Sequence, residues 1–266
     1  MSKHRSAQHP PSRQRLALSA WPAMAAWALT AASPPLAHEF VNTSDFLSGN
    51  ASVQILSDRA PHLKRFSLLR VSPKAPHAPD APGSDETTLF FGLSGECRVS
   101  ADSPCSILSS TQLLRGVAVL VRNGYKHFVH GDCVAATATV ASGPWNEGEP
   151  DDAMVPNPCG GQAGAWPLLR TTNTSALEAE PTAHESDLLR KRVHLRPGRV
   201  PGLLQLSVAT FLPGAECEEH VHDTGTEVYL HFGGRGCHLR ATEADGTRSE
   251  YDLYPHRFDA LHPGTP

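Results

Sequence analysis

The chain has 266 residues, a hydrophobic content of 39%, a formal net charge of -4 and a pI near 6.4. This slightly acidic balance excludes the basic surface that nucleic acids require, so we expect no nucleic-acid partner. The length suits one or two domains, and 23 prolines favour a turn-rich β protein over a helical bundle.

The N-terminus has the pattern of a cleavable leader. Basic residues precede an apolar run over residues 16–32, and small residues up to Ala37 supply cleavage sites. The run is short for a membrane helix and Pro22 interrupts it, so we expect no stable membrane span. We predict a signal peptide over residues 1–37, leading to secretion or to the endomembrane lumen. Because no acidic residue precedes Glu39, an organelle transit peptide is the alternative.

Two further features agree with an oxidising, secretory environment. Asn42, Asn50 and Asn173 each begin a triplet of the N-glycosylation type. The even number of cysteines is compatible with disulfides, with buried free thiols as the alternative, and sequence cannot give the pairing. The six cysteines are Cys97, Cys105, Cys133, Cys159, Cys217 and Cys237.

Short apolar and β-branched runs predict strands in both halves of the chain. These runs cover residues 66–71, 116–121, 134–140, 203–211 and 227–232. Between the halves, a stretch rich in Pro, Gly and acidic residues begins at Ser142 and predicts a linker. We therefore divide the chain after the leader into a first domain over residues 38–141, a linker over 142–184 and a second domain over 185–266.

The two domains are related by an internal repeat. A shift of 140 residues superposes Gly264 on Gly124 and Cys237 on Cys97. The same shift places position 267, just beyond the last residue, opposite His127. We interpret the chain as a duplication of one β unit.

The second half carries a pattern of metal ligands. In an extended strand alternate side chains share a face, so His220 and His222 project together. A short polar turn then lets Glu227 enter beside them on the returning strand. Two imidazoles and one carboxylate suit a divalent transition metal, with manganese or iron preferred here and zinc or nickel as alternatives.

The spacing of Gly214, His220, His222, Glu227 and Gly234 resembles the first signature motif of the cupin superfamily. This resemblance implies an all-β fold of two cupin barrels, double-stranded β-helices of the jelly-roll type. It also implies a fourth ligand, a histidine from a second motif whose beginning the residues at 262–266 resemble. That histidine would follow the last residue, so we expect the second barrel to be truncated here and the natural chain to continue.

The first copy lacks the ligands of this motif. Asp80, Pro82 and Thr87 stand opposite His220, His222 and Glu227. His77 and His127 remain in the first half without the paired spacing, and we interpret them as loop or core histidines. The first barrel is therefore predicted to have a structural role or to form a wall of the substrate site.

His231 is the candidate catalytic residue. Strand alternation places it on the same face as Glu227 and Tyr229, where it could transfer protons near the metal. The alternative is a core histidine whose hydrogen bonds are satisfied.

The layout, over roughly residues 60 to 240, resembles that of the ureidoglycine aminohydrolases, which implies a metal-dependent hydrolase with a small-molecule substrate. This chain departs from that family's pattern, because His220 replaces its glutamate and Thr226 its second histidine. The alternatives are a ligand-binding or storage cupin without activity, and an iron dioxygenase or oxalate-type decarboxylase. The resemblance to cupins also implies a possible homo-oligomer.

Overall fold

The computed structural model describes the chain in segments. They are 26–30, 39–42, 53–56, 63–77, 86–102, 108–122, 125–141, 169–182, 184, 186–197, 199–200, 202–203, 205–221, 225–234, 236–242, 247–253 and 257–261.

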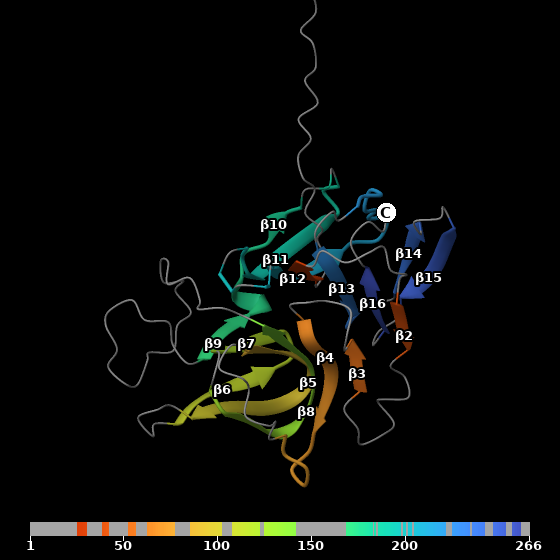
Figure 1. Cartoon of the computed structure of the whole chain (residues 1–266). Helices are drawn as coiled ribbons and strands as arrows, with labels where there is room; N and C mark the ends of the chain where they lie inside the picture. Colours follow the sequence, from red (N-terminus) through yellow and green to blue (C-terminus); the bar gives the residue numbers. More distant parts are fainter. Residues whose placement is uncertain are drawn as a thin grey trace, which may run out of the picture.

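The first sheet is antiparallel and is built mainly from the first half of the chain (Figure 1). Its strand order is β3-β4-β8-β5-β7-β9, and β6 also pairs with β5. The strands are β3 (Val53–Leu56), β4 (Leu63–Val71), β5 (Glu86–Asp102), β6 (Leu108–Leu114), β7 (Val117–Val121), β8 (His127–Ala141) and β9 (Leu169–Asn173).

Two glycines allow the long strand β5 to bend. A side chain at Gly92 would place its Cβ 2.0 Å from the carbonyl oxygen of Leu114, and Gly95 has a φ of +72°. The ladder with β8 shifts register between Gly92 and Ser94. As a result the first half of β5 pairs with β7 and its second half pairs with β6, which curls the sheet toward a barrel.

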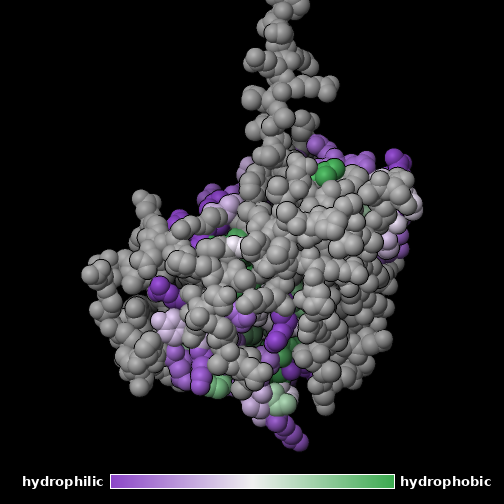
Figure 2. All heavy atoms as spheres, in the orientation of Figure 1, coloured by the Kyte–Doolittle hydropathy of each residue, from purple (hydrophilic) through white to green (hydrophobic). Residues whose placement is uncertain are grey.

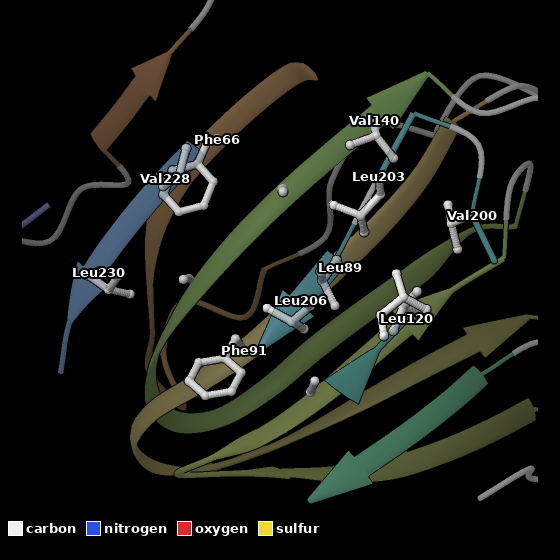
Figure 3. Packing of buried hydrophobic residues seen from close by; sticks show 14 of the residues in the cluster. Phe66, Leu89, Phe91, Leu120, Val140, Val200, Leu203, Leu206, Val228 and Leu230 are labelled. Carbon is white, nitrogen blue, oxygen red and sulfur yellow. The ribbon is translucent and has the colours of Figure 1, made fainter. Parts of the chain in front are cut away.

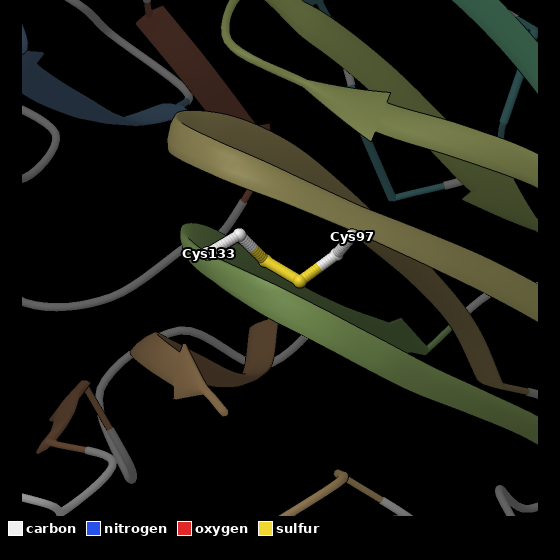
Figure 4. Close-up of a disulfide and its surroundings, with 2 residues drawn as sticks. All are labelled: Cys97 and Cys133. Carbon is white, nitrogen blue, oxygen red and sulfur yellow. A yellow bond between two sulfur atoms is a disulfide. The ribbon is translucent and has the colours of Figure 1, made fainter. Parts of the chain in front are cut away.

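A disulfide joins β5 to β8 beyond this bend. Cys97 and Cys133 are bonded, with their Cα atoms 5.6 Å apart (Figure 4). Cys217 and Cys237 have free thiols, while Cys105 and Cys159 lie outside the described residues. The expected use of cysteines in disulfides is thus confirmed for one pair.

The second sheet is also antiparallel and contains strands from both ends of the chain, in the order β10-β11-β12-β1-β13-β16-β2. A separate hairpin, β14–β15, completes this half. The strands are β1 (Ala26–Thr30), β2 (Glu39–Asn42), β10 (Glu180–Pro181), β11 (Leu189–Leu195), β12 (Gln205–Phe211), β13 (Gly225–His231), β14 (Cys237–Thr242), β15 (Arg248–Leu253) and β16 (Arg257–Leu261).

Buried apolar side chains form two clusters because the first sheet is covered on both faces. One cluster fills the first barrel and includes Phe90 and Val119. Their sequence neighbours point to the other face, where Leu89 and Phe91 meet Leu206 and Val228 of the second sheet (Figure 3). Strand alternation thus gives the first half a core of its own and an apolar layer that holds the two halves together.

All five predicted strand runs are confirmed in type, as parts of β4, β7, β8, β12 and β13. Much of the predicted linker lies outside the described residues, but its last part contains β9, a 3-10 turn over Thr174–Ala176 and β10. Within the predicted leader, β1 pairs with β12 and β13. The domain division and the leader remain predictions.

Two observations concern the surface. On the face shown in Figure 2, the described residues are mostly hydrophilic, with small apolar spots. No helix among the described residues combines the length and apolarity needed to cross a membrane.

Candidate metal site in the second barrel

Glu227 lies on β13 with its side chain completely buried. The hydroxyl of Tyr229, two residues along the same strand, donates a hydrogen bond of 2.5 Å to Glu227 Oε2. Val228 and Leu230 point the other way, into the layer between the sheets. The alternation expected for this strand is confirmed, since the polar residues share the face opposite to the apolar layer.

His220 lies in the loop after β12 and is partly exposed. Its Nδ1 is 2.7 Å from the carbonyl oxygen of Glu218, and because a carbonyl can only accept, Nδ1 is the donor. The neutral ring then carries its lone pair on Nε2. Such a backbone hydrogen bond is the usual way in which a protein orients a metal-binding imidazole.

His222, the second histidine of the predicted ligand set, lies outside the described residues. The predicted set of His220, His222 and Glu227 therefore stays a prediction. The structure brings two other side chains to His220.

These two side chains are His184 and Cys217. One ring nitrogen of each histidine and the Sγ of Cys217 all lie within 4.8 Å of one another. The distance from Cys217 Sγ to His184 Nε2 is 3.0 Å, and the ring centres of His184 and His220 are 5.1 Å apart. We call His184, Cys217 and His220 the His-Cys-His cluster.

His184 is held in place by burial and by a local turn. Its side chain is 5% exposed, and its backbone N–H donates to the hydroxyl of Thr182 over 3.2 Å. Its Nδ1 is buried and has no hydrogen-bond partner among the described residues. The nitrogen of this ring that meets the cluster is Nε2, which lies 3.0 Å from Cys217 Sγ, so Nε2 is the nitrogen available to a metal ion there.

The charges around the cluster are those of a metal-binding site. Burial lowers the pKa of His184, the proximity of His220 lowers it further, and Glu218 and Glu227 oppose this shift. Burial raises the pKa of the Cys217 thiol to about 12, with further contributions from Glu227 and Glu218. Glu227 therefore acts electrostatically on two members of the cluster. Two imidazoles, one thiol and a nearby carboxylate form a donor set that fits a divalent transition metal.

A cavity of about 670 Å³ is lined in part by residues of β12 and β13. Tyr229, His231 and Cys237 form part of its wall, and Arg115 and Arg192 bring positive charge to it. Arg115 comes from the turn between β6 and β7, and its Nη2 donates to the carbonyl of Phe232 over 3.2 Å. Both halves of the molecule thus contribute to the cavity, and the substrate-wall role of the first barrel stays a prediction.

His231 lies on the wall of this cavity, at the end of β13. Its Nδ1 is 3.4 Å from Cys237 Sγ. The structure places it along the strand from Glu227 and Tyr229, as predicted. Its catalytic role stays a prediction.

The histidines of the first half have structural contacts. His127 is 3% exposed, packs edge-on against Phe90 and donates from Nδ1 to the carbonyl of Tyr125. Burial lowers its pKa to about 4. The backbone of His77 bridges to that of Val129. The prediction of core or loop histidines agrees with these contacts.

No pattern in the sequence indicated His184, and Cys217 was predicted to be a disulfide partner or a buried free thiol. His184 is 36 positions before His220, at the boundary assigned to the linker, so no local spacing connects it to the motif. Cys217 had a local signal, because it is three residues from His220 in a loop rich in metal-binding residue types.

Comparisons by sequence find no matching family model and no matching curated protein. Comparison of structures finds proteins with a similar fold. An oxalate decarboxylase from Lactobacillus farciminis, in a formate complex, has a TM-score of 0.53 and 11% identity over 80% of this chain and 75% of its own. A glyoxylate-induced protein from Pseudomonas aeruginosa has a TM-score of 0.51 and 12% identity over 100% of this chain and 90% of its own.

The oxalate decarboxylase of Bacillus subtilis, a protein with Mn(II) centres, has a TM-score of 0.52 and 12% identity over 90% of this chain and 70% of its own. At such low identities the similarity shows the fold and no more. The prediction from the motif at residues 214–234 is confirmed at this level: the chain has the all-β double-barrel fold of the cupins.

Proposed function

We propose that this protein is a metal-dependent cupin whose second barrel acts on a small anionic molecule. The observation that carries the proposal is the convergence of His184, Cys217 and His220 within 4.8 Å of one another, within electrostatic reach of the buried Glu227.

The metal, when bound, would polarise a substrate carboxylate or carbonyl, or activate a water molecule. The residues of the chain supply binding and proton control. Arg115 and Arg192 on the cavity wall favour a negatively charged substrate. Tyr229 donates a hydrogen bond to Glu227 and lines the cavity, and His231 lies on the cavity wall as a candidate proton donor or acceptor.

Among reactions, we favour an oxalate-type decarboxylation or another reaction of a small carboxylic acid. The two cavity arginines support this choice, as does the fold shared with two oxalate decarboxylases. The hydrolase reading, similar to ureidoglycine aminohydrolase, rests on the sequence layout. Incubation with oxalate and with ureidoglycine distinguishes the two hypotheses. A decarboxylase should release carbon dioxide from oxalate, and a hydrolase should release ammonia from ureidoglycine.

Metal analysis of the purified full-length protein tests the proposal. We expect about one divalent transition metal per chain, and we expect His220→Ala to lose most of it because an imidazole ligand is removed. His77→Ala is the matched control, since His77 lies in the first half, and it should keep its metal. Wild-type protein that is folded but free of metal after reconstitution would contradict the proposal and favour the binding or storage alternative.

Secretion, or entry into the endomembrane lumen, remains part of the proposal and is supported by the leader pattern and the Cys97–Cys133 disulfide. A homo-oligomer is proposed from the resemblance to cupins alone.

A further inference from the structure

The second barrel contains two contacts between a thiol and an imidazole. Cys217 lies 3.0 Å from His184 Nε2, and Cys237 lies 3.4 Å from His231 Nδ1. A third atom that can bind a metal lies beside the first contact, because a ring nitrogen of His220 is within 4.8 Å of both partners. Among the described residues, the second contact belongs to no comparable group of three donors.

We propose that Cys217 binds the metal as a thiolate together with His184 and His220, so that the site selects zinc or a similarly thiophilic ion over manganese. This inference rests on the proposed function, since it requires a metal in the second barrel. It changes the expected ligand set, in which His220, His222 and Glu227 offered nitrogen and oxygen only.

The geometry allows one ion to bind all three donors. In a tetrahedral zinc site, bonds of about 2.0–2.3 Å to nitrogen and sulfur place two ligand atoms about 3.3–3.6 Å apart. The ligand atoms of the cluster lie within 4.8 Å of one another, so shifts of about 1 Å or less bring all three to one ion. Cys217 and His220 share one loop after β12 and can make this adjustment without moving a strand.

The ligand chemistry decides which ion is preferred. Thiolate is a soft ligand that favours zinc, whereas carboxylate, carbonyl and water suit manganese. Glu227 is completely buried and already accepts a hydrogen bond from Tyr229, which suits a residue that balances the charge beside the ion. On binding, the Cys217 S–H bond breaks, its electron pair forms the bond to the metal and its proton passes to water.

Cobalt(II) is the probe that tests this ligand set, because a thiolate bound to cobalt produces a charge-transfer absorption in the near ultraviolet and imidazole or carboxylate ligands do not. The full-length protein is stripped with a chelator and titrated with cobalt. We expect the band in the wild type and in Cys237→Ser, which changes the matched thiol. We expect no band in Cys217→Ser, and a loss of zinc affinity of at least about 10–100-fold.

Three results would overturn the inference. Cobalt binding without the band in the wild type, an unchanged band in Cys217→Ser, or equal zinc affinity in that variant would each exclude Cys217 as a ligand while leaving a metal-dependent cupin intact. Failure of the wild type to bind any metal would overturn the proposed function as well. Because Cys217 lies in an exposed loop, we expect the circular dichroism of the metal-free variant to match that of the wild type. Such a match excludes misfolding as the cause of the missing band.

Discussion

At the scale of single residues, His194 shows how the two halves are joined by hydrogen bonds. It is 1% exposed on β11, and both ring nitrogens contact threonines of the neighbouring segment, Nδ1 to Thr172 at 2.7 Å and Nε2 to Thr174 at 2.8 Å. Thr174 has one hydroxyl proton and donates it to the carbonyl of Gly116. His194 Nε2 must therefore be the donor to Thr174, and in the neutral ring Nδ1 accepts from Thr172.

This arrangement makes stability depend on pH. Burial, followed by the charge of Arg170, lowers the pKa of His194 from 6.5 to about 4. In the unfolded chain the histidine binds a proton below about pH 6.5, so between pH 6.5 and 4 the unfolded state holds more protons. The free energy of unfolding therefore falls as the pH falls through this window, by up to about 3 kcal/mol for this residue.

Urea unfolding at several pH values between 4 and 7 measures the effect. His194→Gln keeps a hydrogen-bond donor and an acceptor but does not titrate. We expect its free energy of unfolding to be lower than that of the wild type at pH 7, and to fall less between pH 7 and pH 4. His127, with a pKa of about 4, contributes a similar slope that remains in the variant. An identical pH dependence in wild type and variant would show that His194 is not the titrating group.

The sequence predicted the proximity of site residues that share one strand. It did not predict the proximity of residues that are distant along the chain. Strand alternation correctly placed Glu227 and Tyr229 on one face, where they are joined by a hydrogen bond, and Val228 and Leu230 lie in the apolar layer. His184 reaches His220 only because β11 and β12 pair and bring their flanking loops together. A distance of 36 positions along the chain has no periodicity that predicts such a contact.

At the scale of elements, the longest ladder joins β5 to β8 and depends on a bend that glycine permits. Gly92 allows the backbone of β5 to approach Leu114, and the disulfide between Cys97 and Cys133 fastens the ladder beyond the bend. Both cysteines are almost completely buried in the core of the first barrel. The bridge therefore restricts the unfolded chain and also fills space in the folded one.

Removing this disulfide should destabilise the protein clearly. The bridge closes a loop across 36 positions, and the chain-entropy model gives about 3–4 kcal/mol for such a loop. We expect the Cys97→Ala, Cys133→Ala double variant to have a free energy of unfolding lower by about this amount. Its midpoint of denaturant unfolding should fall accordingly. Cys237→Ala, which has a free thiol, is the matched control and should unfold near the wild-type midpoint.

At the scale of the whole molecule, the second sheet depends on a strand from the far N-terminal part of the described chain. β1 lies between β12 and β13 and pairs with both. The strand that bears Glu227 is thus held in the sheet by β1 on one side and β16 on the other. Loss of β1 would expose the backbone of two strands, one of which carries the site.

Two deletion variants test the contribution of β1. Removal of residues 1–25 retains β1, and we expect it to leave the free energy of unfolding unchanged. Removal of residues 1–37 deletes it, and we expect a lower free energy of unfolding together with weaker metal binding, because β13 loses a neighbour. Equal stability of the two variants would show that β1 does not support the sheet. Cleavage of the predicted leader after residue 37 would also remove β1, so the second variant represents that product.

The sequence by itself determined the fold class and the strand pattern, because alternation and turn residues are local properties of the chain. It also determined the candidate metal residues within the motif, since His220 and Glu227 are only seven positions apart in the sequence. The tertiary structure decided which distant side chains join them. It brought His184 and Cys217 to His220, paired Cys97 with Cys133 and inserted β1 into the second sheet. These contacts depend on which strands pair and how the two sheets pack, and such long-range choices are made by the burial of the whole apolar layer rather than by any local segment.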